Sequence, residues 1–368
     1  MSSAHTPSEA DARPADSAHS AAPPVPVAPP GADERFRKRG LFGTIMARPE
    51  IGALVGALVV FAFFAVAAPT FTQPDSISTV LYGASTIGIM VVGVSLLMIG
   101  GEFDLSAGVA VISSALAASM FSWYFAFNVW VGVGVGLVVS LLIGLINGVL
   151  LMRTKLPSFI VTLAMFLMLT GLNLALTRLI GGSVSSPSIT ALDGFGAAEA
   201  IFATSITVFG VDFRITILYW ILLVAVASLI LHKTKVGNWI FAVGGDENAA
   251  RAVGVPVAKT KIGLFMGVGF CGWILGMHNL FAFQTVQSGA GVSNEFLYII
   301  GAVIGGCLLT GGFGSAVGGA IGALIFRMAS RGIVYAQWNP DWFKFFLGMM
   351  LLLATIINMY VRKRVDKK

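Results

Sequence analysis

Apolar stretches long enough to cross a bilayer recur from Ile51 almost to the C-terminus, and few folds can accommodate them. A helix needs roughly 20 apolar residues to cross a hydrocarbon layer about 30 Å thick. The chain is 57% hydrophobic and only 11% charged, so a water-soluble core cannot bury all of these stretches. Because hydrocarbon offers the backbone no hydrogen-bond partners, segments of this length must span as helices. The sequence therefore predicts an all-α, polytopic membrane protein.

The apolar stretches divide into ten predicted membrane spans. Glycine-rich segments precede the third and ninth spans, which leaves open whether these two cross the membrane completely. The predicted spans lie near residues 51–68, 79–100, 104–122, 128–152, 157–177, 215–231, 262–283, 296–310, 315–332 and 342–361.

The distribution of basic residues orients the predicted spans. With the N-terminus inside, 18 of the 23 Lys and Arg residues fall on the cytoplasmic side. Helix ends on that side carry the Lys and Arg excess, so we predict a multi-pass protein of the cell (inner) membrane with both termini in the cytoplasm. The net charge of +6 then reflects orientation and not nucleic-acid binding. The basic residues assigned to the outside are Arg178, Arg214, Arg327, Arg331 and Lys344.

The two ends differ in composition from the transmembrane domain, which we place at residues 51–361. Residues 1–50 hold eight of the fourteen prolines, mostly among Ala, Ser and Asp. Such a segment buries too little apolar surface to offset its chain entropy, so we predict a disordered cytoplasmic tail. The first apolar run starts at Ile51, too late for a secretory signal. Residues 362–368 are predicted to form a basic cytoplasmic tail.

The sequence contains no pattern typical of catalysis. The dipeptide Gly-Lys, which every phosphate loop needs, occurs nowhere, so any nucleotide energy must come from another subunit. Zinc-protease and serine-hydrolase patterns are also absent. Cys271 and Cys307 stand inside apolar segments as small hydrophobic residues, and His278 is expected to be packed or hydrogen-bonded inside a span. We therefore predict a non-enzymatic chain with no catalytic residues, no metal site and no cofactor of its own.

A first polar region, residues 100–108, places Glu102 and Asp104 between two long apolar runs. Carboxylates are costly at the centre of a bilayer, so these two should sit at the cytoplasmic interface or line water. Asp104 is expected to cap the N-terminus of the next helix. A role in a gate or substrate path is compatible with that capping.

Two loops form the other polar regions. The outward loop 178–214 is either a solvated cap or a docking surface for a soluble partner. The cytoplasmic loop 232–261 contains a predicted two-turn helix, with Asp246 as N-cap, Glu247 paired with Arg251, and Gly254 as the stop. So short a helix is marginal alone in water, and we expect the membrane surface or a second protein to pack against it.

Four motifs, in order, carry a family resemblance: Gly-Gly-Glu-Phe-Asp-Leu-Ser at 100–106, Gly-Leu-Ile-Asn-Gly at 144–148 followed by 156–163, the segment 242–255, and Gly-Gly-Phe-Gly-Ser at 311–315. From about residue 84 to 358 the chain resembles the permease subunits of ribose/xylose-type ATP-binding-cassette importers for monosaccharides. It departs from many members at Ser158, where they carry a second proline. The segment 311–318 also echoes 100–108, a weak sign of the internal repeats common in transporters.

The resemblance implies a fold, a mechanism and partners. Two ten-span subunits, identical or closely related, would form a dimer with the pathway between them. Cytoplasmic ATPase subunits would hold ATP and Mg²⁺, an extracytoplasmic sugar-binding protein would deliver the monosaccharide, and transport would proceed by alternating access. The residues implied to couple this chain to the ATPase are Gly245, Asp246, Glu247, Ala250, Arg251 and Gly254.

Polar residues near the predicted helix ends are candidates for the wall or gate of the pathway. For Ser106, Asn147, Thr162 and Asn173 the alternative role is interhelical hydrogen bonding. Phe159 would act as a stacking or gating ring. The candidates are Glu102, Asp104, Ser106, Asn147, Phe159, Thr162 and Asn173.

The cargo and the energy source have alternatives. Related permeases carry nucleosides or branched-chain amino acids, so these solutes are the second choice of cargo. An ion-coupled secondary transporter would place several paired ionisable residues inside its spans, and only Glu102 and Asp104 approach that pattern. A membrane-embedded enzyme is disfavoured because no set of His, Cys and carboxylate residues converges.

Overall fold

The computed structural model describes residues 49–366 of the chain, with side chains for residues 50–356. In this part, eight helices are long and apolar enough to cross a membrane, which matches the predicted spans one to seven and nine. Residues 1–48, most of the predicted tail, lie outside the described residues. The eight helices are α2 (Pro49–Ala67), α3 (Pro74–Ile99), α4 (Ala107–Phe125), α5 (Val129–Thr154), α6 (Ser158–Gly181), α8 (Thr216–Lys233), α11 (Val257–Phe283) and α13 (Ala316–Tyr335).

The remaining elements are shorter or lie at the end of the chain. They are the 3-10 turns η2 (Pro69–Thr72) and η3 (Pro340–Trp342), helices α7 (Phe195–Phe202), α9 (Lys235–Gly245), α10 (Glu247–Ala252), α12 (Asn294–Ile304) and α14 (Phe343–Asp366), and strands β1 (Ser205–Val208) and β2 (Val211–Arg214). Helix α14 is the tenth predicted span, and it continues to Asp366 where a basic tail had been expected from residue 362.

The eighth predicted span, 296–310, is wrong in length. Helix α12 has 11 residues, which cover about 16 Å and so only about half of a bilayer. The chain then leaves the helix through glycines with positive φ, Gly306 at +94° and Gly311 at +79°. Glycine adopts this backbone region readily, and other residues do not. The glycine backbone therefore ends the helix at Ile304, and the hydrophobicity of residues 305–310 gave no sign of that end.

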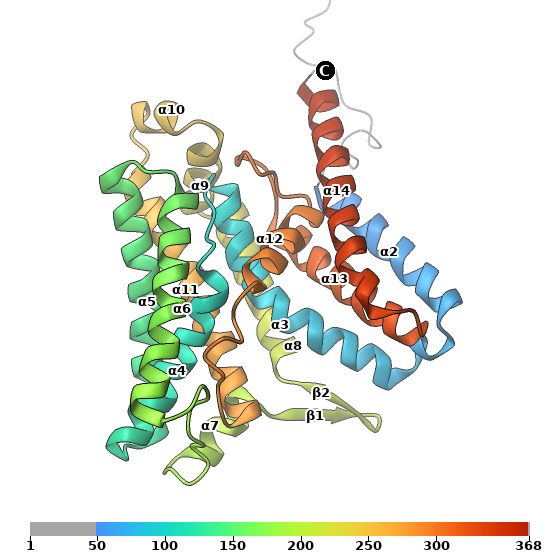
Figure 1. Cartoon of the computed structure of the whole chain (residues 1–368). Helices are drawn as coiled ribbons and strands as arrows, with labels where there is room; N and C mark the ends of the chain where they lie inside the picture. The colour runs from blue at the N-terminus through green and yellow to red at the C-terminus, as the bar shows by residue number, and fades with distance from the viewer. Residues whose placement is uncertain (1–48, 367–368) are drawn as a thin grey trace, which may run out of the picture. The chain divides into compact units, whose positions relative to one another are not determined.

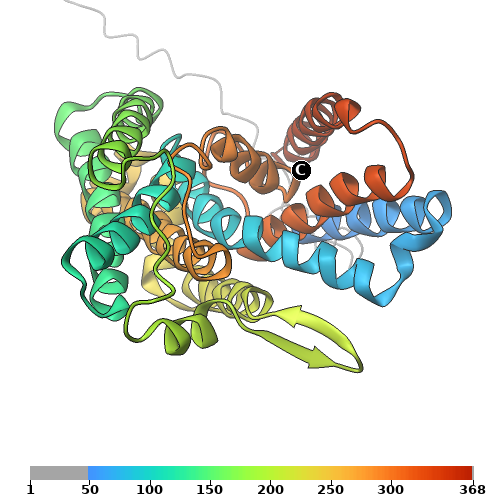
Figure 2. The ribbon, with the colours of Figure 1, turned by 60° about the horizontal axis from the view of Figure 1, so that its bottom comes forward.

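Strands β1 and β2 form an antiparallel hairpin within the outward loop, an element that the sequence did not predict. Val208 pairs with Val211, and the two residues between them, Phe209 and Gly210, have φ of +51° and +80°. Positive φ at both central residues is typical of tight hairpin turns, but phenylalanine is an unusual occupant. Figure 2 shows the hairpin standing out from the helices beside α8.

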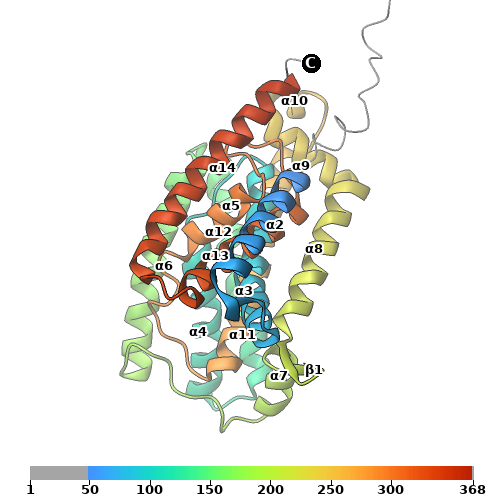
Figure 3. The same ribbon diagram turned by 90° about the vertical axis from the view of Figure 1, so that its right-hand side faces the viewer.

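Helices α3, α4, α11 and α13 form most of the interior, whereas α2, α6 and α8 are largely exposed. Glycines let the interior helices approach closely. A Cβ at Gly144 of α5 would lie 2.4 Å from the carbonyl oxygen of Phe265 in α11, which is the small-residue packing common in membranes. Helices α2 and α14 lie on one side, next to α13 (Figure 3). Cys271 and Cys307 are buried free thiols, as predicted.

Candidate functional site

Helix α4 begins inside the bundle. After α3 ends at Ile99, residues 100–106 run without regular helix, and α4 starts at Ala107. The Ser106 hydroxyl accepts a hydrogen bond of 2.9 Å from Asn147, which stands seven residues before the end of α5. At 1.5 Å per residue, α4 therefore begins about 10 Å inside that end of α5. We call this end, where α10 also lies, the α10 end, and the opposite one the hairpin end.

Four predicted pathway residues meet at the start of α4. One Asp104 carboxylate oxygen accepts from the backbone N–H of Ser106 (2.8 Å) and from its hydroxyl (2.6 Å). The Thr162 hydroxyl accepts from the backbone N–H of Leu105 (3.1 Å). The amide oxygen of Asn147 is buried and has no hydrogen-bond partner among the described residues. The structure thus joins Asp104, Ser106, Asn147 and Thr162 in one buried polar network.

The predicted capping by Asp104 needs correction. Ser106 occupies the N-cap position of α4 and makes no side-chain cap bond. Asp104 lies two residues earlier and holds the turn that leads into the helix. The sequence placed the helix start too early because Asp-Leu-Ser before an apolar run reads as a start signal, while the turn at residues 105–106 delays the helix.

Two other predicted pathway residues lie outside this network. Phe159 on α6 has 55% of its surface exposed. Asn173, further along α6, accepts a 3.0 Å hydrogen bond from the Ser113 hydroxyl of α4. Asn173 therefore has the interhelical bond that was the alternative to a pathway role.

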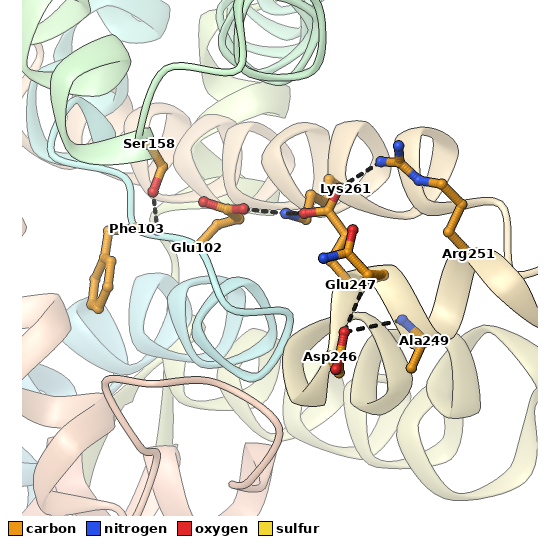
Figure 4. A network of polar contacts seen from close by, with 9 residues as sticks. Glu102, Phe103, Ser158, Asp246, Glu247, Ala249, Arg251 and Lys261 are labelled. Atoms are coloured by element: carbon orange, nitrogen blue, oxygen red, sulfur yellow. Dashed lines mark hydrogen bonds and ion pairs between the residues drawn. The ribbon is translucent and has the colours of Figure 1, made fainter. Parts of the chain in front are cut away.

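Lys261 is a central residue of the site that the sequence reasoning missed. Its ammonium group forms an ion pair with Glu102 and a second one, at 2.6 Å, with Glu247 of α10 (Figure 4). The side chains of Lys261 and Glu102 are only 8% and 10% exposed. The predicted seventh span started at residue 262 and so left Lys261 in a loop, whereas α11 begins at Val257 and carries it.

The short helix α10 has the local structure that the sequence predicted. Asp246 accepts hydrogen bonds from the N–H groups of Asn248 (2.9 Å) and Ala249 (3.0 Å), and Glu247 pairs with Arg251 at 2.7 Å. The hydrogen bond from Lys261 is the main reason that the pKa of Glu247 lies below its ordinary value, against the opposing effect of partial burial.

The packing partner of α10 differs from the expectation. Ala250 is 3% exposed and packs with Val243 and Val257 of the same chain, so part of the surface that the helix needs is internal. Beyond the helix, Gly254 has the predicted stop conformation, with φ of +83°. Val253, just before it, is 80% exposed and leaves an apolar side chain available to a partner.

Three glycine pairs meet at the base of α10. The Gly312 N–H donates a 2.8 Å hydrogen bond to the carbonyl of Ile99. A Cβ at Gly244 would lie 1.8 Å from that carbonyl oxygen, and one at Gly311 would lie 2.7 Å from the Cα of Gly101. The backbones are therefore in direct contact, and the two glycine segments that echo each other in sequence also touch in space. We call this contact the glycine junction; its contacting residues are Gly101 of the first pair, Gly244 and Gly245 of the second, and Gly311 and Gly312 of the third.

A cleft of about 1050 Å³ opens beside the ion pairs, between α10, the start of α11 and the α5–α6 connection. Glu102, Lys261 and Glu247 form part of its wall, together with Ser158 and Arg251. Ser158 also accepts a hydrogen bond of 3.2 Å from the backbone N–H of Phe103 (Figure 4). The predicted coupling residues Glu247 and Arg251 and the predicted pathway residue Glu102 thus share one cleft.

The short helix α12 begins beside the start of α4. A Cβ at Gly108 would lie 2.7 Å from Oε2 of Glu295 and 3.0 Å from its backbone nitrogen. Glu295 is 3% exposed, and Oε2 has no hydrogen-bond partner within residues 49–366. Two helices that both start inside the bundle therefore meet at their N-termini, with an unpaired carboxyl oxygen between them. The sequence reasoning missed Glu295 because the eighth span was predicted to begin one residue later.

Comparison with known proteins identifies the family. Residues 76–355 match the family model described as branched-chain amino acid transport system / permease component. The chain belongs to this family. The permease is also similar to curated proteins along most of its length. It is 29% identical over 314 residues to the ribose import permease of Escherichia coli K12, covering 84% of this chain and 93% of that one.

Two further relatives show the same extent of likeness. A probable ABC transporter permease of Escherichia coli K12 is 32% identical over 322 residues, which cover 86% of this chain and 92% of that protein. The fructose import permease of Rhizobium meliloti is 28% identical over 312 residues, with 84% and 85% covered. No solved structure matches the permease. Family membership and the apolar helices confirm the predicted all-α, multi-pass membrane protein.

Proposed function

We propose that this chain is the permease subunit of an ATP-driven importer that carries a monosaccharide across the cell membrane by alternating access. The names of its relatives support a sugar as the cargo, since they include ribose, fructose and galactose/methyl galactoside import permeases. The structural observation that carries the proposal is the buried Lys261 bridge. It joins an exposed helix, α10, to the segment that leads into α4.

In this proposal the α10 end faces the cytoplasm, as the excess of Lys and Arg there suggests. Helix α10 presents Arg251 and the exposed Val253 to an ATPase subunit that holds ATP and Mg²⁺. The sequence has no phosphate loop, which is consistent with a separate ATPase. An extracytoplasmic sugar-binding protein would meet the hairpin end, and a second permease subunit would complete the pathway.

Movement of α10 has two physical routes into the membrane. The first is electrostatic, from Glu247 through Lys261 to Glu102. The second is steric, from Gly244 to the carbonyl of Ile99 and to Gly312, where backbone touches backbone. The first route reaches the segment that precedes α4, and the second reaches the end of α3 and the segment that precedes α13. A close-packed contact transmits displacement because it has no void to absorb it.

The sugar path is proposed to pass the paired starts of α4 and α12. Interrupted helices whose N-termini meet inside the membrane are common at transporter binding sites. Stripping a sugar hydroxyl of water is costly unless a new hydrogen bond forms. The unpartnered amide oxygen of Asn147 and Oε2 of Glu295 are acceptors that can form such bonds. Asp104, Ser106 and Thr162 would then hold these helix starts in place.

Uptake into membrane vesicles tests the proposal, with the permease co-expressed with its ATPase and binding protein. Val253→Asp, and separately the combined reversal Glu247→Arg and Arg251→Glu, should abolish ATP-dependent sugar uptake. Asn238→Asp, an exposed change on the neighbouring helix α9, is the matched control and should leave uptake unchanged. Folded protein is quantified by size-exclusion chromatography for each variant.

Two results would overturn the proposal. Uptake that follows an ion gradient and persists with an inactivated ATPase would indicate a secondary transporter. ATP-dependent uptake of nucleosides or branched-chain amino acids, with no sugar transported, would keep the architecture but refute the cargo.

A further inference from the structure

Arg327 is a guanidinium group inside a membrane-spanning helix. It stands near the middle of α13, which runs from Ala316 to Tyr335, although its charge had been assigned to the outer side. Its guanidinium rests on Gly83 of α3, where an added Cβ would lie 2.1 Å from Nε. The Nε atom is buried, and within residues 49–366 it has no hydrogen-bond partner. An arginine at this depth is rare and typically faces a polar partner or a solute path.

Two further arginines lie in the same region, Arg331 near Arg327 and Arg214 over the ring of Tyr82 of α3. Arg331 follows Arg327 by one helical turn, and Arg327 is close enough to Tyr82 and Arg331 to interact with both electrostatically. The Cζ atom of Arg214, at the end of β2, lies 5.8 Å from the centre of the Tyr82 ring. We call Arg214, Arg327 and Arg331 the arginine cluster.

The cluster has no acidic partner in the described part of the chain. All of the ion pairs found there involve Glu102 or Glu247 at the α10 end. Asp212 shares a face of β2 with Arg214, two residues further on, but its carboxylate accepts a 2.5 Å hydrogen bond from the Thr207 hydroxyl and forms none of these ion pairs. Three positive charges therefore share one region, and no carboxylate among residues 50–356 forms an ion pair with any of them.

Tyr82 is held in a fixed orientation beside these charges. The carbonyl oxygen of Phe202 can only accept, so the His278 Nδ1 atom at 2.8 Å must donate to it. In the neutral imidazole, Nε2 then accepts, and the Tyr82 hydroxyl at 3.0 Å donates to Nε2. The oxygen of Tyr82 keeps its own lone pairs, which can accept a hydrogen bond from a ligand hydroxyl.

We propose that the arginine cluster and Tyr82 form a solute site for an anionic monosaccharide, one that carries a carboxylate or a phosphate. The anionic group would pair with Arg327 and Arg331, because guanidinium groups bind both anions in a bidentate manner. A sugar hydroxyl would donate to the oxygen of Tyr82. The inference rests on the proposed function, since it names the class of sugar that the permease would carry.

Depth favours a solute over an acidic side chain of a docked protein. Gly83, on which the Arg327 guanidinium rests, lies nine residues from Pro74 at the hairpin end of α3. That distance corresponds to about 13 Å along the helix. A folded binding protein that docks on the membrane surface does not reach so far, whereas a released sugar does.

Equilibrium binding to the purified full-length permease in zwitterionic nanodiscs tests the site. The probes are D-galacturonate, D-gluconate and D-glucose 6-phosphate, with neutral D-galactose and D-glucose as counterparts and with acetate and inorganic phosphate as simple anions. At least one anionic sugar should bind about tenfold more tightly than its neutral counterpart. The sugar acids and the sugar phosphate distinguish a carboxylate from a phosphate as the recognised group.

Variants connect that binding to the cluster. Arg327→Gln should weaken binding of the anionic sugar about 30-fold or more, since it removes one partner of a buried charge pair. Arg178→Gln removes an exposed arginine from the hairpin end of α6 and should change nothing. Gly83→Ala keeps every charge but displaces the guanidinium, and it should also weaken binding. Tryptophan fluorescence and size-exclusion chromatography verify the fold of each variant.

The inference is overturned by equal affinity for anionic and neutral sugars, by no binding of any anionic sugar, or by binding that Arg327→Gln leaves intact. Acetate or phosphate binding as tightly as the sugar derivatives would also refute a sugar site. ATP-dependent uptake separates this inference from the proposed function. Neutral-sugar uptake that is insensitive to Arg327→Gln would refute the arginine site alone. Uptake of an anionic sugar that needs Arg327 but continues without ATP or an active ATPase would refute the importer alone.

Discussion

Replacement of Lys261 by methionine would test the central ion pairs of the permease. Methionine fills a similar volume but leaves the Glu102 carboxylate, which is 10% exposed, without its cation. Breaking a buried pair from one side costs about 3–5 kcal/mol, because an uncompensated charge remains. The Glu247 side chain is 35% exposed, so losing that second pair should add less than about 1 kcal/mol. We expect Lys261→Met to lower the free energy of unfolding by about 3–5 kcal/mol.

A double-mutant cycle isolates this cause from general damage. Adding Glu102→Gln to Lys261→Met removes the stranded charge and should restore about 2 kcal/mol, because only an amide hydrogen-bonding demand remains. Unfolding is followed by circular dichroism during titration with sodium dodecyl sulfate in mixed micelles. If Lys261→Met has wild-type stability, or if the two changes are simply additive, the buried pair does not hold α10 to the segment before α4.

Three further predictions concern the same end of the molecule. Gly244→Ala should sharply reduce thermal stability and uptake. Gly245→Ala is the control, because its added Cβ would meet nothing within 4 Å, and it should retain the wild-type melting temperature. Equal melting temperatures for the two variants would disprove the glycine junction. Asp246→Ala removes the N-cap of α10 and should lower the local stability of that helix by about 1 kcal/mol. The loss is measured as faster amide hydrogen exchange at residues 248 and 249, and unchanged exchange would mean that the cap is dispensable. Because the pKa of Glu247 is held below its ordinary value near 4.5, its charged form stabilises α10 above that pH, and the stabilisation is lost as the pH falls through the lowered pKa. Protection factors of α10 should therefore fall on acidification in the wild type and hardly change in Lys261→Met, and an acid response of equal size in both would contradict the assignment.

The local structure of α10 was predictable because its determinants are neighbours in sequence. A cap, an i to i+4 ion pair and a glycine stop act within two turns of helix, and the structure has all three at Asp246, Glu247 and Gly254. The likeness of the two glycine segments was also visible in the sequence, although their contact was not. Hydrophobicity located eight long spans for the same reason, since it is a property of each segment by itself.

The residues that pair at long range escaped prediction. Lys261 is 159 positions from Glu102, and nothing in either segment names the other. Arg327 was assigned to the outer side because the positive-inside rule counts Lys and Arg residues near helix ends and takes no account of packing inside the bundle. Its burial against Gly83 depends on how α13 packs on α3. Helix α12 is short because the chain turns at glycines with positive φ. Glycines in the sequence are equally compatible with the end of a full-length span, so they did not reveal the early stop.

Composition and hydrophobic segments alone determined that this chain lies in a membrane, roughly where it crosses, and which short motifs relate it to other permeases. They could do so because lipid imposes the same requirement on every segment: enough apolar side chains, and a backbone that satisfies its own hydrogen bonds. Tertiary structure alone decided that Lys261 bridges α10 to Glu102, that three glycine pairs touch, and that Arg214 and Arg327 both lie beside Tyr82 without an ion pair to a described acid. Those arrangements depend on which helix faces come together, and that choice is made by close packing over the whole bundle.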